Sequence, residues 1–187
     1  MCKCVLGGTP DRSNETFWGG EIPWINSGEV NRFRITSPTE TITKLGLEHS
    51  ATKLLPVKTT VVAITGATLG QYSLLEIAAC ANQSVVGIIQ NNTLPYEFIY
   101  PFVAHNMDAL LSHQTGGAQQ HINKQNIESL PIRLPTSESL NAYKDLVSPL
   151  YDLIGKNEFS NSRLIELRNS LLPKLMSGEI DVSAVEL

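Results

Sequence analysis

Residue types that carry enzymatic chemistry occur in this sequence, but not in a catalytic arrangement. The sequence contains no G-x-S-x-G nucleophile motif, no H-E-x-x-H zinc motif and no P-loop, and its glycine pairs do not form a dinucleotide fingerprint. The four histidines are scattered. The N-P-P-[YF] and D-P-P-[YF] tetrapeptides, with which amino-methyltransferases hold a flipped base, are also missing. We therefore expect a chain with no catalytic activity and no cofactor of its own.

The three cysteines predict neither a metal centre nor a disulfide framework. Cys2 and Cys4 form a lone C-x-C pair, whereas a tetrahedral zinc site needs two further ligands at suitable spacing. Cys80 stands alone in an apolar run. An odd number of cysteines and an N-terminus without an apolar signal segment indicate reduced thiols in a cytoplasmic protein.

Polar loops bracketed by glycine are the segments best suited to binding. Asparagine and glutamine present a donor and an acceptor together, which suits adenine, while arginine and lysine suit guanine or phosphate. Ordinary turn chemistry is the alternative interpretation of the same residues. The segments are, in chain order, GGTPDRSNETFWGG, IPWINSGEV, TGATLGQY, CANQSV and TGGAQQHINKQ.

The elements that must position these loops predict an α+β domain with a twisted β-sheet and short helices. Apolar and β-branched runs at 60–65, 72–79 and 84–90 predict three neighbouring strands. Helical spacing over 95–114 predicts two short helices or one bent helix, with Pro101 as the kink, Asn106 as a cap and Gly116 as a stop. A short helix at 124–130 and an edge strand before Pro135 complete the domain.

The composition changes near 130–135, where we place a domain boundary. The predicted parts are the α+β domain at 1–135, a long helix within 136–176 and a tail at 177–187. Heptad-spaced apolar residues predict a coiled-coil helix over 137–172, about 54 Å long, although Pro149 and Gly155 interrupt the pattern. A rod of this length favours a partner helix, and the alternative is a helix packed back on its own domain.

Composition sets limits on the partners of the chain. It has 187 residues and a net charge of −4 from 14 basic and 18 acidic residues, which argues against a histone-like nucleic-acid binder but allows a local DNA-binding surface. No apolar run reaches the roughly 18 residues that span a bilayer, so we expect no membrane contact.

The order of the loop motifs resembles the target-recognition domain of specificity subunits from type I restriction-modification systems. GGTP at 7–10, FWGG at 17–20 and IPW at 22–24 occur in the order typical of that family. They are followed by GATLG at 66–70, NQ at 82–83, GGAQ at 116–119 and IN at 122–123. The ending LRNSLLPKLMSGEIDV at 167–182 is similar to the family's conserved helix end and tail. The resemblance covers nearly the whole chain.

This resemblance implies a subunit that selects a DNA sequence and leaves the chemistry to partners. Separate methylation subunits, with S-adenosylmethionine as their cofactor, would modify adenine, and a restriction subunit would cleave. The family's usual subunit has two recognition domains and two conserved helices, whereas this sequence holds one of each, so we expect a half-subunit that pairs as a homodimer through antiparallel helices. Its start close to GGTP, where relatives have a leading segment, leaves open a missing edge strand or a truncated chain.

Two sets of residues follow as candidates, one for double-stranded DNA and one for the second helix. The DNA set lies in the polar loops: Arg12, Ser13, Asn14, Thr65, Thr68, Gln119, Gln120 and Lys124. The dimerisation set lies along the heptads: Leu140, Val147, Leu150, Leu153, Ile154, Leu164 and Leu171. Two other functions compete with this reading, namely a dimerisation module or silent specificity cassette that never binds DNA, and a fragment of a DNA methyltransferase.

Overall fold

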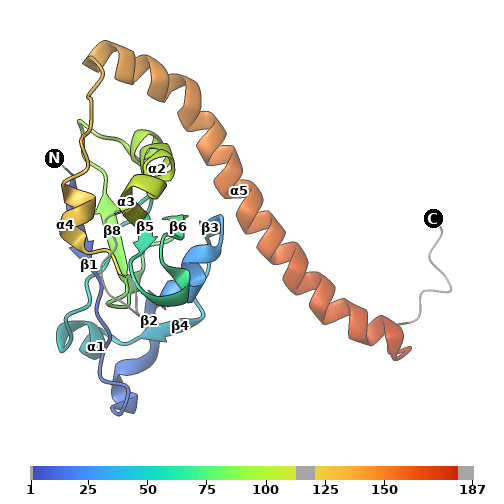
Figure 1. Cartoon of the computed structure of the whole chain (residues 1–187). Helices are drawn as coiled ribbons and strands as arrows, with labels where there is room; N and C mark the ends of the chain where they lie inside the picture. The colour runs from blue at the N-terminus through green and yellow to red at the C-terminus, as the bar shows by residue number, and fades with distance from the viewer. Residues whose placement is uncertain (1, 113–120, 181–187) are drawn as a thin grey trace.

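A computed structural model describes residues 2–112 and 121–180 of the chain. It confirms an α+β fold in which two β-sheets and short helices are followed by one long C-terminal helix (Figure 1). No helix within these residues has the length and apolarity needed to cross a membrane. The strands are β1 (Lys3–Leu6), β2 (Trp18–Ile25), β3 (Arg34–Ile35), β4 (Glu40–Ile42), β5 (Thr60–Ala63), β6 (Tyr72–Leu75), β7 (Cys80–Ala81) and β8 (Val85–Ile89). The α-helices are α1 (Lys44–Glu48), α2 (Tyr96–His105), α3 (Met107–Ser112), α4 (Lys124–Glu128) and α5 (Ser137–Met176).

The larger sheet has the strand order β1-β8-β5-β6-β3. The three predicted strands are therefore neighbours, as expected, with β5 paired antiparallel to both β6 and β8. All four residues of β5 are buried, because apolar clusters cover both faces of the sheet. The predicted strand at 72–79 ends at Leu75, since the chain then crosses to the second sheet and pairs again as β7.

The second sheet, with the order β4-β2-β7, was not predicted. Its main strand β2 contains Gly19, Gly20 and Pro23, residue types that strands usually avoid. The pairing of β2 with β4 shifts between Trp18 and Ile22, which marks a β-bulge. The bulge explains the glycines: Gly19 has φ +76°, and a Cβ on Gly20 would lie 2.5 Å from the Cα of Thr43.

Helix α2 continues through Pro101 and ends at Asn106, whose side chain bonds back to the carbonyl of Phe102 at 2.8 Å. The predicted break therefore falls five residues later than the proline. Proline cannot bond the carbonyl four residues before it, here that of Glu97. The hydroxyl of Tyr143 on α5 donates to this carbonyl at 3.1 Å, so the long helix compensates for the lost bond.

The short helix predicted at 124–130 is present as α4, with Asn123 and Asn126 forming a capping box. The edge strand predicted before Pro135 is wrong, because residues 131–136 form no ladder. Pro131 and Pro135 lack backbone donors, and Ile132 packs against the core instead. The predicted stop at Gly116 lies outside the described residues.

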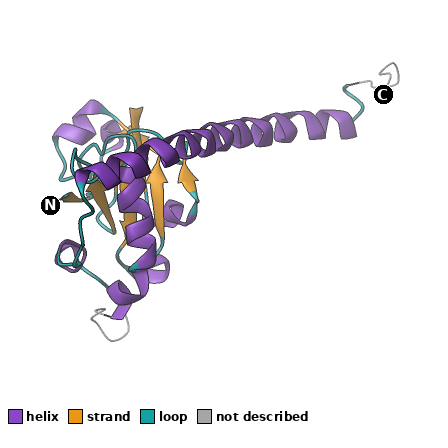
Figure 2. Cartoon of the chain, turned by 90° about the horizontal axis from the view of Figure 1, so that it is seen from above, coloured by secondary structure: helices purple, strands orange, loops and turns teal. Residues whose placement is uncertain are grey.

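Helix α5 has 40 residues, capped by Thr136, and is about 60 Å long. Its first part bends over the domain close to α2, and the rest runs away from the domain (Figures 1 and 2). Pro149 lies inside this first part, and an internal proline is an ordinary cause of a helix bend. The helix is thus partly packed on its own domain and partly without a partner in the described chain.

A buried ionic cluster attaches α5 to the edge of the larger sheet. Glu76 accepts a bond from Lys58 at 2.6 Å and lies 3.5 Å from the Nε of Arg34. The side chains of Arg34 and Glu76 are almost fully buried. Gly155 of α5 covers the cluster so closely that a Cβ would lie 2.7 Å from the Glu76 carboxylate. Asp152, 4.0 Å from Lys58, adds a second acidic group from the helix.

Contacts on either side extend this attachment along the helix. The hydroxyl of Ser148 donates to the carboxylate of Glu97, which is 1% exposed, and Ser162 bonds Thr36 at 3.1 Å. The aromatic ring of Tyr151 packs edge to face against those of Tyr96 and Tyr100. Beyond Ser162 every described side chain of α5 is exposed.

Replacing Glu76 by leucine should lower the free energy of unfolding by about 3–5 kcal/mol, because Arg34 and Lys58 then lack their buried counter-charge. The double replacement Glu76→Leu with Arg34→Met should recover part of this loss, since it also removes the unpaired guanidinium. Urea unfolding followed by tryptophan fluorescence measures both. A double variant that is less stable than Glu76→Leu alone would contradict the role of Glu76 as the counter-charge of Arg34.

Candidate nucleic-acid interface

The motif loops gather at one end of the larger sheet. Antiparallel pairing places Leu6 opposite Val86 and Ala63 opposite Val85. Strands β1 and β5 therefore end where β8 begins. The loops at 7–14, 64–71 and 82–84 follow or precede these strand ends and must lie side by side. An isolated bridge between Thr65 and His121 brings the segment before α4 to the same place.

The GGTP segment is a tight packing element. The backbone amides of Gly7 and Gly8 donate to the carbonyls of Val85 and Ala81 at 2.9 and 2.8 Å. A Cβ on Gly7 would lie 2.0 Å from the carbonyl oxygen of Asn82, so no larger residue fits. The next residue, Thr9, donates its hydroxyl to the side chain of Gln83. The GGTP and NQ motifs, 74 positions apart at these two residues, are thus in direct contact.

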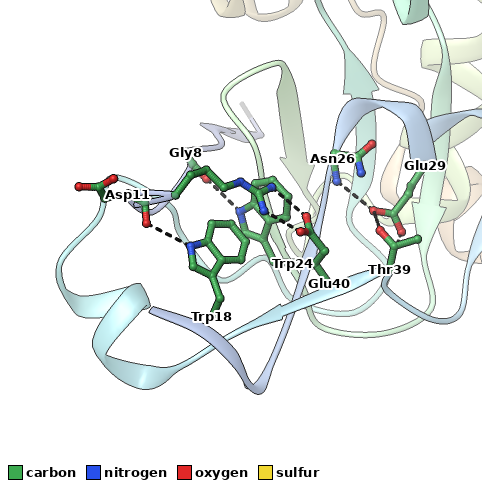
Figure 3. Close-up of polar contacts among 9 residues, drawn as sticks. Gly8, Asp11, Trp18, Trp24, Asn26, Glu29, Thr39 and Glu40 are labelled. Carbon is green, nitrogen blue, oxygen red and sulfur yellow. Dashed lines mark hydrogen bonds and ion pairs between the residues drawn. The ribbon is translucent and has the colours of Figure 1, made fainter. Parts of the chain in front are cut away.

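Two tryptophans form the floor of the first loop. The indole nitrogen of Trp24 donates to the carbonyl of Gly8, and that of Trp18 donates to the carbonyl of Asp11, both at 3.1 Å (Figure 3). The rings meet edge to face with centroids 5.1 Å apart. Trp24 is buried, whereas Trp18 is half-buried at the bulge. The FWGG and IPW motifs therefore hold the loop in place through the two indoles.

Arg12 lies over this floor, where an aromatic ring and a carboxylate both contact its guanidinium. Its guanidinium carbon is 3.8 Å from the centre of the Trp18 ring. Its two terminal nitrogens donate to the two carboxylate oxygens of Glu40 at 2.6 and 2.8 Å. The Arg12 hydrogen bonds lower the pKa of Glu40. Sequence reasoning did not single out Glu40, because it contributes only through a contact 28 positions away.

Glu40 is positioned through its chain neighbour Thr39, which bonds a buried carboxylate. Glu29, 4% exposed, accepts bonds from the backbone amides of Asn26 and Thr39, both at 3.0 Å, and from the Thr39 hydroxyl at 2.9 Å (Figure 3). These bonds fasten the end of β2 to the start of β4. Glu40 follows as the first residue of β4, opposite Trp24 in β2.

The GATLG loop forms the second part of the surface. Gly66 and Gly70 have φ values of +71° and +83°, which favour glycine. The loop is joined to the segment before α4 by the amide of Ile122, which donates to the carbonyl of Ile64 at 3.1 Å. An open groove runs along this junction. It is lined by Leu6, Ile64, Thr65, His121, Ile122, Asn123, Lys124, Gln125 and Glu128.

The other candidates of the DNA set have varied surroundings. The Asn14 side chain caps a short 3-10 helix, and Ser13 bonds Asp11 in the manner of a turn. The hydroxyl of Thr68 bonds the carbonyl of Thr65 at 3.4 Å. Lys124 lies 3.3 Å from Glu128 across one helical turn. Ordinary turn and cap chemistry thus accounts for the side chains of Ser13 and Asn14, while Gln119 and Gln120 lie outside the described residues.

The cysteines are surrounded mainly by apolar groups. Burial raises the pKa of the Cys4 thiol to about 11 and also raises that of Cys80. Thiols in such surroundings stay protonated and unreactive at neutral pH. Within 2–112 and 121–180, no three histidine, cysteine, aspartate or glutamate side chains are grouped so that they could hold a metal ion.

Replacing Arg12 by glutamine should raise the pKa of Glu40 toward its ordinary value of 4.5, because the hydrogen bonds from the guanidinium are lost. In the parent the folded-state pKa is the lower one, so the pair contributes stability above pH 4.5 that is lost as the pH falls through the folded-state value. Carbon-detected NMR titration of the Glu40 carboxyl measures the change. Asp11, whose pKa is lowered by hydrogen bonds from Ser13, is the internal control and should not move.

Comparison with known proteins gives a consistent match over most of the sequence. The model of the type I restriction modification DNA specificity domain matches residues 1–169. The specificity subunit of the type I restriction enzyme HindI from Haemophilus influenzae is 29% identical over 184 residues, covering 95% of this chain and 39% of that protein. The EcoR124I/EcoR124II specificity subunit from Escherichia coli is 26% identical over 172 residues, covering 89% and 43%. The chain spans about two fifths of the length of these relatives.

Solved structures agree in fold. The type I restriction-modification S subunit from M. genitalium superimposes with a TM-score of 0.63 at 15% identity, covering 94% of this chain and 43% of that one. The HsdS subunit from Thermoanaerobacter tengcongensis gives 0.58 at 15% identity, covering 96% and 43%. The sequence match and the shared fold lead to one conclusion: the chain belongs to the type I restriction modification DNA specificity domain family.

Proposed function

We propose that this chain selects a DNA sequence for a type I restriction-modification complex and has no catalytic activity of its own. The observation that carries the proposal is the strand register, which brings the loops at 7–14, 64–71 and 82–84 to one end of the sheet. The family supports this role, since its model describes a DNA specificity domain and the relatives are specificity subunits of type I restriction enzymes. Methylation subunits, with S-adenosylmethionine as cofactor, would modify adenine, and a restriction subunit would cleave.

The proposed DNA contacts combine charge with adaptable polar groups. Arg12 and Lys124 provide cations for guanine or phosphate. Thr65 lies on the groove between the GATLG loop and α4, where its side chain makes no cap bond to the following short helix. Gln119 and Gln120 have the donor and acceptor pair that suits adenine. The full proposed set is Arg12, Ser13, Asn14, Thr65, Thr68, Gln119, Gln120 and Lys124.

The uncovered side of α5 supports a proposed homodimer through antiparallel helices. Leu146, Leu150 and Leu153 are 72%, 56% and 55% exposed, and they share one side of the helix by their spacing. Leu164, Leu167 and Leu171 continue that side and are 61%, 51% and 37% exposed. Such a stripe requires a partner in water, and a second copy covers it most simply. The two domains would then read inverted half-sites about one helical turn apart, in a cytoplasmic complex.

Not every residue of the dimerisation set faces this stripe. Leu140 is only 8% exposed, and Val147 and Ile154 are half-buried. They lie on the side of α5 that packs on its own domain. They therefore contribute to the fold of one chain. Leu150, Leu153, Leu164 and Leu171 remain the proposed contacts between chains.

The target itself can be found by mapping methylated adenines in cells that carry this chain with its methylation partner. Alanine at Gln119 or Gln120 should then weaken binding to a duplex with that target by about 1–3 kcal/mol if the side chain reads a base. Fluorescence anisotropy at fixed salt, with target and scrambled duplexes, measures the difference. Equal weakening on both duplexes would mean that the residue contacts the DNA backbone and not a base. A parent chain with no preference for the target duplex would favour the silent specificity cassette.

Aspartate at both Leu150 and Leu153 should convert a dimer into a monomer, because two charges would be buried in the helix interface. Light scattering across tens of micromolar protein measures the mass. Aspartate at Asn141 and Ser170 is the matched control, since helical geometry places both on a side away from the stripe. A monomeric parent would contradict the proposed dimer.

The methylation subunit should increase affinity for the target duplex at least tenfold, about 1.4 kcal/mol. The reason is the net charge of −4, which leaves few cations to release counterions from DNA. Titration of one labelled duplex with and without the subunit, at the same salt concentration, measures the gain. If this chain alone binds as tightly as the complex, the recognition surface is sufficient by itself.

A further inference from the structure

Arg12 and Glu40 form a closed ion pair at the first loop of the proposed DNA surface. Both nitrogens at the end of Arg12 are engaged by the two oxygens of one carboxylate. The pair is open to water, with side chains 51% and 38% exposed. An open groove lies beside it, lined by Arg12, Glu15, Trp18, Gly19, Thr39, Glu40 and Thr41.

The surrounding structure does not depend on this ion pair. Trp18 is already held by its bond to the Asp11 carbonyl and by its contact with Trp24. The start of β4 is already held by the bonds between Thr39 and Glu29. Exposed pairs of this kind contribute little to stability. Arg12 and Glu40 are therefore brought to one place by two separately anchored segments.

The chemistry of the pair imitates a DNA contact. A carboxylate presents two acceptor oxygens in a plane to the fork of an arginine, and the guanine edge presents O6 and N7 in the same way. Two phosphate oxygens make the same bidentate contact. While Glu40 occupies the edge formed by Nη1 and Nη2, neither group of DNA can bind that edge.

We propose that Glu40 is an internal competitor for the edge of Arg12 that contacts DNA. A duplex that contacts this edge must displace Glu40, and a bidentate acceptor at this position, either guanine or phosphate, compensates for the lost ion pair. The Trp18 ring stacks against the guanidinium and holds it at the surface when Glu40 is displaced. This inference rests on the proposed function and adds a residue that opposes binding, where the DNA set contains only residues that favour it.

The test is a double-mutant cycle on the full chain with its methylation subunit. The probes are a labelled duplex with the target found by methylation mapping and a scrambled duplex. Glu40→Gln should bind the target about twofold to fivefold more tightly, as expected for loss of a competing exposed pair. Arg12→Gln should bind more weakly, and Glu40→Gln should have no effect in that background. Glu15→Gln removes the same charge from the same groove and should not reproduce the gain.

The two acceptor sources give different results in this cycle. A guanine contact predicts a gain confined to the target, which 7-deazaguanine at the contacted position abolishes because N7 is missing. A phosphate contact predicts equal gains on both duplexes and a shallower salt dependence for Arg12→Gln. A target-preferring parent whose affinity is unchanged or weakened by Glu40→Gln, or a gain that persists without Arg12, overturns the competition. A parent with no preference for the target overturns the proposed function instead.

Discussion

Antiparallel pairing of β8 with both β1 and β5 is the constraint on which the candidate interface depends. Strands that run in opposite directions place the end of one beside the start of the next. The loops after β1 and β5 are thereby brought to the loop before β8, although they are far apart in sequence. The glycines of GGTP tighten this arrangement, since their amides bond the carbonyls of Val85 and Ala81 directly. A surface of several loops results from one sheet register.

The second constraint is electrostatic and attaches helix α5 to the sheet at the end opposite the motif loops. Buried Glu76 holds Arg34 and Lys58 at the edge of the sheet, and Gly155 lets α5 approach this cluster closely. The cluster places α5 against this edge of the sheet. The orientation of the loops relative to a second domain would follow from it, because the same helix carries the open apolar stripe.

Sequence reasoning succeeded where the signal is local and failed where it depends on tertiary contacts. The strands β5 and β8 and the helix α5 were predicted from apolar runs and heptad spacing. The second sheet was not predicted because its main strand contains Gly19, Gly20 and Pro23, residue types that strands usually avoid. A β-bulge accommodates the two glycines. The heptads were found as one stripe, but the fold divides them, since Leu140 packs on its own domain while Leu150 stays open. Glu40 carried no local signal at all.

The proposed function requires DNA to meet the end of the sheet where the motif loops gather. Hydrogen–deuterium exchange on the complex of this chain, its methylation subunit and a target duplex tests this requirement. DNA should slow exchange in peptides that cover 7–14, 64–71 and 121–124. Slowed exchange confined to the opposite end of the sheet, at 56–59 and 90–94, with no change in the motif loops, would contradict it.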